Sequence, residues 1–196
     1  LARTLATVAS SRVFWAYVGC GAAAFVALFA FLIGSPAALI VFLDASPQDF
    51  SLYFAIVMVG NILGYPTGAR LVARIGLDRL LMIGVFGGLV SALTLAGLAL
   101  AGVNTIAAII TPVFFYMFFF ALTLPPATAG ALSPFPKIAG AASSLLGFVQ
   151  LGTAALCGAV VGAFENGTQI PMVVAITIAG IAGVIAFAAV RANARA

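Results

Sequence analysis

The chain has 196 residues, of which 65% are hydrophobic and only 6% are charged. Because an ordinary soluble domain carries about 25% charged residues, this composition excludes a water-soluble globular fold and indicates a protein embedded in a lipid bilayer. The net charge of +4 comes from cations that are spread over several connecting segments. Nucleic acid is therefore not an expected partner, since binding it requires basic side chains gathered on one face.

Each membrane crossing needs about 20 apolar residues, since the hydrocarbon layer is about 30 Å thick and an α-helix rises about 1.5 Å per residue. Six such apolar runs follow one another, and the short connections between them favour a single domain covering residues 1–196. An all-α integral membrane fold is therefore predicted, with helices at residues 13–42, 47–74, 79–100, 105–129, 138–164 and 168–190.

Residues that cap or interrupt helices mark the ends of the first three runs. In the first run, Gly34-Ser35-Pro36 predicts a kink about two-thirds of the way along. Ser46 is expected to cap the second helix, with Pro47 at its first position and Asp49 in the first turn, where the helix dipole favours an acid. Asp78 is expected to cap the third helix.

Proline also interrupts the fourth run, where Pro125 and Pro126 predict a broken or kinked helix. This segment has a faint counterpart in the first run, because FAFLIGSPA at residues 29–37 and FFALTLPPA at residues 119–127 are identical at four of nine positions. The two helices cross in opposite directions, as an inverted repeat of three plus three helices requires. Interrupted helices at matching places of such repeats indicate a substrate site.

All the basic residues fall on one side of this six-helix topology, and three of the four acids fall on the other. The basic residues are Arg3, Arg12, Arg70, Arg74, Arg79, Lys137, Arg191 and Arg195, and the three acids are Asp44, Asp49 and Glu165. Because Lys and Arg concentrate on the cytoplasmic side of membrane proteins, both termini are expected in the cytoplasm.

Small residues recur at helical spacing on the second and fifth helices. The candidate interface glycines are Gly60, Gly64 and Gly68 on the second helix and Gly147, Gly158 and Gly162 on the fifth. Such rows let helix backbones approach closely in lipid, where dispersion contacts drive association. Two interpretations stay open here: the rows seal a dimer of two copies of the chain, or they pack helices within one chain.

Three stretches of the chain carry a resemblance to a known family. They are FLIGSPAALIVFLDASPQDFSLYFA at residues 31–55, GARLVARIGLDRLL at residues 68–81 and ALSPFPKIAGAASSLLGFVQLGTAALCGAVVG at residues 131–162. They resemble the major facilitator superfamily, and within it the bicyclomycin-resistance (Bcr/CflA) drug exporters. With the spans between them, the resemblance covers nearly the whole chain and corresponds to the carboxy-terminal six-helix half of such a protein.

The resemblance implies an exporter in the bacterial inner membrane that moves small, largely apolar drugs, such as amphenicol- or bicyclomycin-type antibiotics, by alternating access. A chain of half the family's length must pair with a second copy of itself or with a separate amino-terminal half. The family's cytoplasmic loop motif matches Gly68, Arg70, Arg74 and Gly76. Ala73 stands where the family usually has Asp, which removes the acid of the family's charge-relay latch.

By the same resemblance, the first and fourth helices line a central cavity that the second and fifth helices flank. The candidate substrate-binding residues are Tyr17, Phe31 and Ser35, then Tyr116, Phe120 and Thr123, with Phe25, Phe29 and Phe119 on adjoining strips and Asn61 and Gln150 as mid-depth amides. An aromatic lining with few polar groups suits a small apolar ligand. The alternative interpretation is that the phenylalanine rows only pack helices and that Gln150 bonds across a dimer.

Other functional classes fit the sequence less well. No catalytic residue, metal site or cofactor is predicted, because the chain has no His and its intramembrane Ser and Cys residues lack a neighbouring base. A selective channel would need a ring of carbonyls or charges, and no filter sequence is present. A non-transporting membrane scaffold stays open as an alternative, as does the carboxy-terminal half of a proton-coupled antiporter. Without an acid inside the membrane, a symmetric dimer is expected to move neutral drugs by facilitated diffusion.

Overall fold

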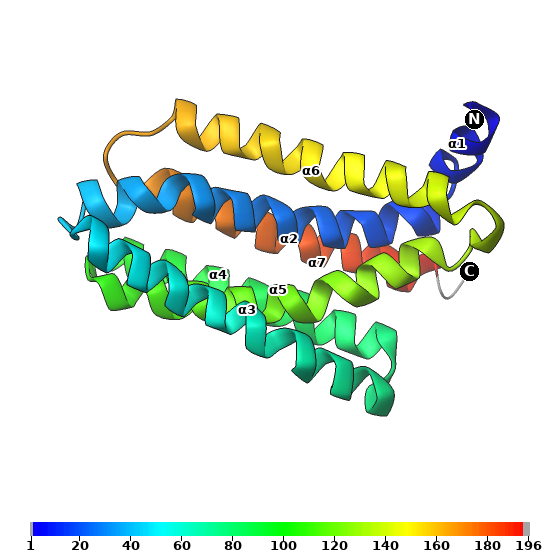
Figure 1. Ribbon diagram of the computed structural model, residues 1–196, viewed down its shortest axis with the longest axis horizontal. Helices are drawn as coiled ribbons and strands as arrows, with labels where there is room; N and C mark the ends of the chain where they lie inside the picture. The colour runs from blue at the N-terminus through cyan, green and yellow to red at the C-terminus, as the bar shows by residue number, and fades with distance from the viewer. Residues whose placement is uncertain (1, 194–196) are drawn as a thin grey trace.

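The structure, a computed structural model, describes the backbone of residues 2–193 and the side chains of residues 5–192. All regular structure within these bounds is helical (Figure 1). The elements are α1 (Ala2–Ala9), α2 (Arg12–Pro36), the π-helical η1 (Ala37–Val41), α3 (Pro47–Ile75), α4 (Leu77–Leu100), α5 (Ile106–Leu132), the 3₁₀ turn η2 (Pro136–Ile138), α6 (Ala139–Ala163) and α7 (Ile170–Asn193).

Six of these helical segments, α2 with η1, α3, α4, α5, η2 with α6, and α7, are long and apolar enough to cross a membrane. The six predicted spans are therefore confirmed, and the chain is a multi-pass membrane protein by length and composition. The predicted second-helix start is also confirmed, because the Ser46 hydroxyl accepts a hydrogen bond from the Asp49 backbone N–H at 3.1 Å, with Pro47 in the first turn. The Ser46 hydroxyl also donates to the Asp49 carboxylate at 2.8 Å.

The structure corrects one predicted helix start and one predicted break inside a helix. The α4 helix begins at Leu77, because Gly76 makes a one-residue turn from α3 with φ near +80°, a conformation that glycine adopts without strain. Asp78 therefore lies in the first turn rather than at the cap. Of the broken or kinked helix predicted at Pro125 and Pro126, the break is wrong, since α5 runs through both prolines to Leu132, and the kink stays a prediction. Packed neighbouring helices allow a membrane helix to accommodate proline in this way.

The six spanning helices form a bundle with two central members, α2 and α5 (Figure 1). The α2 helix packs on α6 and α7, and α5 packs on α3 and α4. The bundle closes through contacts between α2 and α5 and between α4 and α7. The α3 and α6 helices therefore lie at the periphery, each packed mainly on a single helix.

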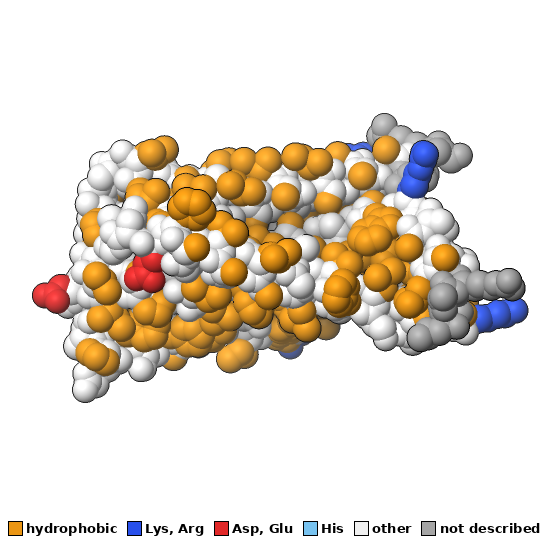
Figure 2. Space-filling model, turned by 90° about the horizontal axis from the view of Figure 1, so that it is seen from above, with side chains coloured by type: hydrophobic (Ala, Val, Ile, Leu, Met, Phe, Trp, Pro, Cys, Tyr) orange, Lys and Arg blue, Asp and Glu red, His pale blue; other side chains and the backbone are white. Residues whose placement is uncertain are grey.

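The two ends of the bundle differ in charge (Figure 2). One end, called here the basic end, holds the start of α2, the α3–α4 turn, η2 and the end of α7. The cations with described side chains at this end are Arg12, Arg70, Arg74, Arg79, Lys137 and Arg191. The opposite end, called the acidic end, carries Asp44, Asp49 and Glu165. Arg3 and Arg195, which also belong to the predicted distribution, lie outside the described side chains.

One long-range hydrogen bond between side chains joins helices at each end. At the basic end, the Tyr17 hydroxyl on α2 donates to the Asp78 carboxylate at the start of α4, at 2.8 Å. At the acidic end, the Gln169 amide before α7 donates to the Asn104 side-chain oxygen before α5, at 3.0 Å. Each bond therefore fixes the start of one central helix against a helix that lies far from it in the sequence.

The glycine rows of α3 and α6 pack mainly inside the chain. A methyl group at Gly60 would meet the carbonyl oxygen of Phe114 on α5, and one at Gly64 would lie 2.5 Å from the carbonyl oxygen of Phe118. Gly68 is buried against the same helix, and a methyl group at Gly158 would meet Ile33 on α2. For these four glycines the contacts favour packing within one chain, because α5 and α2 already cover them.

Two glycines of the predicted interface differ from the others. Gly147 is half-buried and has no atom within 4 Å of the place where a Cβ would lie. Gly162 is exposed, and its nearest neighbour is the Ile33 side chain at 4.0 Å. A role for Gly147 and Gly162 in contacts between copies stays a prediction.

Candidate functional site

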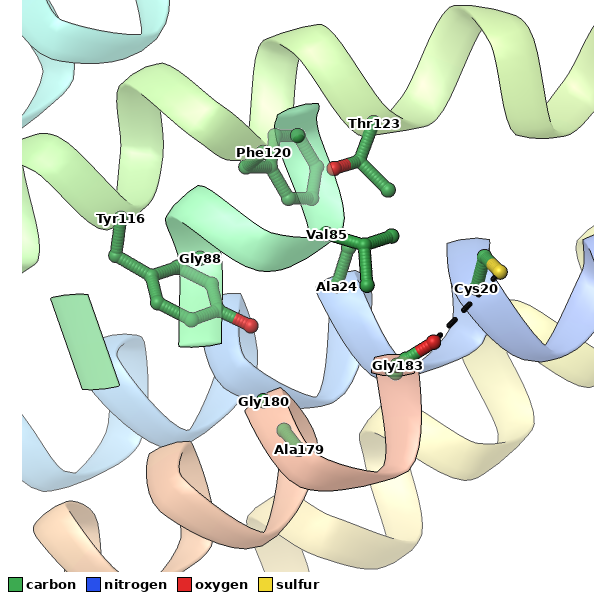
Figure 3. A pocket seen from close by; sticks show the side chains of 12 residues that line it. Cys20, Ala24, Val85, Gly88, Tyr116, Phe120, Thr123, Ala179, Gly180 and Gly183 are labelled. Carbon is green, nitrogen blue, oxygen red and sulfur yellow. Dashed lines mark hydrogen bonds between the residues drawn. The ribbon is translucent and has the colours of Figure 1, made fainter. Parts of the chain in front are cut away.

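A small cavity lies in the interior of the bundle, where α2, α4, α5 and α7 meet (Figure 3). Its volume is about 20 Å³, which is room for a single water molecule. Its lining residues are Cys20, Ala23 and Ala24 on α2, Gly84, Val85 and Gly88 on α4, Tyr116, Phe120 and Thr123 on α5, and Ala179, Gly180 and Gly183 on α7.

Glycines on α4 and α7 create this space, because each leaves out the side chain that would fill it. Tyr116 is only 5% exposed, and its hydroxyl points into the cavity between these two helices (Figure 3). Thr123 donates its hydroxyl hydrogen to the Phe119 carbonyl of its own helix at 2.9 Å, and the Cys20 thiol faces the Gly183 carbonyl at 3.8 Å. The Tyr116 hydroxyl is thus the free polar group of the cavity.

The Gln150 amide forms a second polar feature, at the junction of α6 with α2 and α5. Gln150 is 5% exposed, and its Nε2 atom is buried without a hydrogen-bond partner. The amide fits against Gly21 of α2, where a methyl group would collide with it, and Ala127 of α5 lies beside the same point. A buried donor without an acceptor costs about 1–3 kcal/mol, so the Gln150 amide is an energetically costly feature of this helix junction.

Ser35 is the other predicted site residue with an unmet polar atom. Its side chain is fully buried near the end of α2, and its Oγ atom has no hydrogen-bond partner. Within the described side chains, Ser35 Oγ and Gln150 Nε2 are the two completely buried polar atoms in this condition, whereas the Tyr116 hydroxyl borders the cavity. Since the great majority of buried polar side-chain atoms are hydrogen-bonded, these two positions are exceptions within the bundle.

The structure brings some of the other predicted residues together. Phe25 meets Phe120 edge to face, with ring centroids 5.6 Å apart, so the first and fourth spans contribute to one aromatic cluster beside the cavity. Phe119 lies on the neighbouring strip, with its ring against Gly87 of α4. Phe29 on α2 is half-buried. Tyr116, Phe120 and Thr123 thus share the cavity, as their helical spacing predicts.

Other predicted residues lie apart from this cluster. Tyr17 has its ring against Gly130 and its hydroxyl on Asp78, so it fastens the basic end. Phe31 is fully buried and stacks on Phe54 of α3, with ring centroids 5.9 Å apart. Asn61 is half-buried on the peripheral α3 helix. These residues do not line the interior cavity.

Sequence reasoning missed the small residues that line the cavity. They are Cys20 on α2, Gly84 and Gly88 on α4, and Gly180 and Gly183 on α7. A signal was present, because glycines four and three residues apart on two helices mark a close approach or a space in a membrane bundle. The pairing of those two helices, however, cannot be read from either helix alone.

No protein-family model matches the chain, and a search of curated proteins finds no match either.

Proposed function

We propose that the chain is a half-size membrane transport unit for small, largely apolar compounds, built as two three-helix repeats of opposite orientation. The helix pairing supports this architecture. Exchanging α2 with α5, α3 with α6 and α4 with α7 turns the α2–α6 and α2–α7 contacts into the α5–α3 and α5–α4 contacts, and leaves the α2–α5 and α4–α7 contacts in place. Inverted repeats of this kind are typical of secondary transporters, which bind substrate at the repeat interface.

The single observation that carries the transport proposal is the unmet Gln150 amide, buried where the first, fourth and fifth spans meet. A mid-membrane amide is costly unless it is hydrogen-bonded or faces a cavity or a partner. The aromatic pair of Phe25 and Phe120 and the free Tyr116 hydroxyl supply an apolar surface with a second polar group. A neutral, compact molecule with carbonyl and hydroxyl groups, such as an amphenicol- or bicyclomycin-type antibiotic, suits this combination.

The interior cavity of about 20 Å³ is far smaller than the several hundred Å³ that a drug needs. Transport by alternating access therefore requires α5 to separate from α2 so that the aromatic cluster opens. In this proposal the structure corresponds to a closed state of the unit.

A second copy of the chain is the proposed partner. The peripheral helices α3 and α6 present large apolar side chains, among them Ile62 at 65% and Phe148 at 75% exposure. These outer faces, rather than the buried glycine rows, are the surfaces that a second copy covers in this proposal. The basic end faces the cytoplasm of a bacterial cell, by the positive-inside rule. A separate amino-terminal half, or a scaffold role without transport, is the alternative.

Binding of a labelled amphenicol to the purified chain in lipid nanodiscs tests the proposal. Gln150→Leu keeps the side-chain volume and removes the amide, so it should raise the dissociation constant about five- to tenfold, the equivalent of one lost hydrogen bond. Leu93→Ala, on the exposed face of α4, is the matched control and should bind normally. Absence of saturable binding to the native chain would exclude this substrate class, and saturable binding without flux into liposomes would favour the scaffold.

A further inference from the structure

A pocket of about 510 Å³ lies between α6 and α7, with Val26 of α2 at its base. Its lining is apolar apart from the Asn166 amide and the Cys157 thiol, and includes Val160, Phe164, Val174 and Ile178. All the α6 and α7 residues of the lining belong to the halves of these helices nearest the acidic end. The pocket therefore lies at the depth of the hydrocarbon chains of the leaflet at that end.

An acidic side chain stands beside this pocket. A recess of about 10 Å³ adjoins it, shares Val161 and Pro171 with it, and is lined by Glu165 and Thr168. Glu165 follows the last turn of α6, and its side chain is exposed. An apolar pocket in the hydrocarbon layer thus has an exposed acidic side chain in an adjoining recess, toward the end of the bundle where the headgroups of the leaflet lie.

A second apolar pocket, of about 400 Å³, lies between α3, α4 and α5 near the basic end. Under the helix exchange described above, α6, α7 and α2 correspond to α3, α4 and α5. The two pockets therefore occupy matching places, one in each leaflet. Membrane lipid is present in both leaflets, whereas a solute with one binding site needs only one pocket. The pair of matching pockets therefore favours lipid as the occupant.

We propose that the pocket between α6 and α7 binds one acyl chain of a phospholipid from the leaflet at the acidic end, and that Glu165 selects a headgroup carrying an ammonium group. The acyl chain covers the apolar side chains of the lining. The ammonium group supplies the charge opposite to Glu165. This site is separate from the interior cavity, so it stands whether or not the chain transports a drug.

Native mass spectrometry of the full chain, extracted from vesicles of phosphatidylethanolamine and phosphatidylglycerol with identical acyl chains, tests the proposal. The native chain should retain one phosphatidylethanolamine and prefer it over phosphatidylglycerol by about fivefold, the factor expected from a single charge at a membrane surface. Ala175→Leu narrows the pocket beside Val26 and should weaken retention of the lipid. Ala182→Leu, exposed about two turns further along α7, is the control and should retain the lipid. Equal retention by Ala175→Leu and the native chain overturns the proposed site.

The headgroup preference has its own pair of variants. Glu165→Gln should keep the lipid and lose the preference for the ammonium headgroup. Asp44→Asn is the matched control, because Asp44 is an exposed acid at the same end, does not line the pocket, and has a positive φ that Asn tolerates. An unchanged preference in Glu165→Gln overturns the role of this acid.

A measurement on the unmodified chain avoids the risk that a variant misfolds. Cys157 lines the pocket, whereas Cys20 is only 1% exposed inside the bundle. Added phosphatidylethanolamine should slow alkylation of Cys157 by N-ethylmaleimide several-fold and leave Cys20 unchanged. An alkylation rate of Cys157 that does not respond to the lipid, or that responds only to the amphenicol, overturns the proposal in favour of an empty pocket or a drug site.

Discussion

The Gln150 amide on α6 occupies the space that Gly21 on α2 leaves open. Because a methyl group at Gly21 would meet Gln150 Nε2, Gly21→Ala should displace the amide and lower the free energy of unfolding by about 1–3 kcal/mol. Combining Gly21→Ala with Gln150→Ala should cost less than the sum of the two, since the second change removes the obstructed group. Thermal unfolding of the purified variants in mild detergent measures both effects.

Gly147 provides the control for this pair, because it lies on the same helix as Gln150 and has no atom within 4 Å of a Cβ position. Gly147→Ala should therefore be neutral or stabilise the chain by up to about 1 kcal/mol, through helix propensity alone. A strictly additive double variant of Gly21 and Gln150 would show that the two side chains do not share one space.

The sequence alone singled out Gln150, because an amide in the middle of an apolar span is conspicuous and costly. It could not single out Gly21 as its neighbour. That contact depends on the register and rotation of α6 against α2, which side-chain packing determines. The same limit explains why Tyr17 was assigned to a substrate site although its hydroxyl bonds Asp78 at the basic end.

The α3 and α5 helices approach each other closely at Gly64 of α3, which has no side chain. Gly64→Ala should force the two helices apart, because its methyl group would lie 2.5 Å from the Phe118 carbonyl oxygen and 2.6 Å from Ala121 Cβ. We expect a loss of about 1–3 kcal/mol in the stability of the chain. Gly152→Ala on α6 is the control, since nothing lies within 4 Å of its Cβ position.

Size-exclusion chromatography with light scattering separates this effect from an effect on assembly. Gly64→Ala should lower the unfolding temperature of the chain without changing the mass of the folded fraction. A folded variant with native stability and half the native mass would instead return Gly64 to the interface between copies.

The helices themselves were predictable because their signals are local. An apolar run of sufficient length determines each span, and the Ser46-Pro47-Asp49 cap determines the start of α3, almost without reference to neighbouring helices. The errors arose where neighbouring helices decide the outcome. Surrounding helices keep α5 continuous through Pro125 and Pro126, and a single glycine, Gly76, suffices to turn the chain between α3 and α4.

For the whole molecule, the separation of charge makes a clear prediction of orientation. In a variant with Cys20 and Cys157 replaced by Ala, a cysteine in place of Ser133, which is exposed in the α5–α6 connection at the basic end, should react only with a cytoplasmic reagent. A cysteine in place of Asn104, at the acidic end, should react from the outside. Labelling of both positions from the same side would contradict the six-span topology.

The placement of acids predicts how transport responds to a pH gradient. Asp44, Asp49, Asp78 and Glu165 are all exposed and lie at the ends of the bundle, whereas proton-coupled carriers place a titratable group within the membrane. Drug flux by the proposed dimer in liposomes should therefore be the same with and without an imposed pH gradient. Uphill accumulation that collapses on adding a protonophore would contradict this prediction and indicate an unlike partner half.

The two hydrogen bonds at the ends of the bundle also set an order of events during synthesis. Tyr17 and Asp78 are 61 residues apart and both belong to the first three spans, so their bond can form while the remaining spans are still on the ribosome. Asn104 cannot reach its partner until Gln169 has been made, just ahead of the sixth span. The basic end is therefore fastened first and the acidic end last, and a chain arrested before residue 169 leaves the acidic end unfastened.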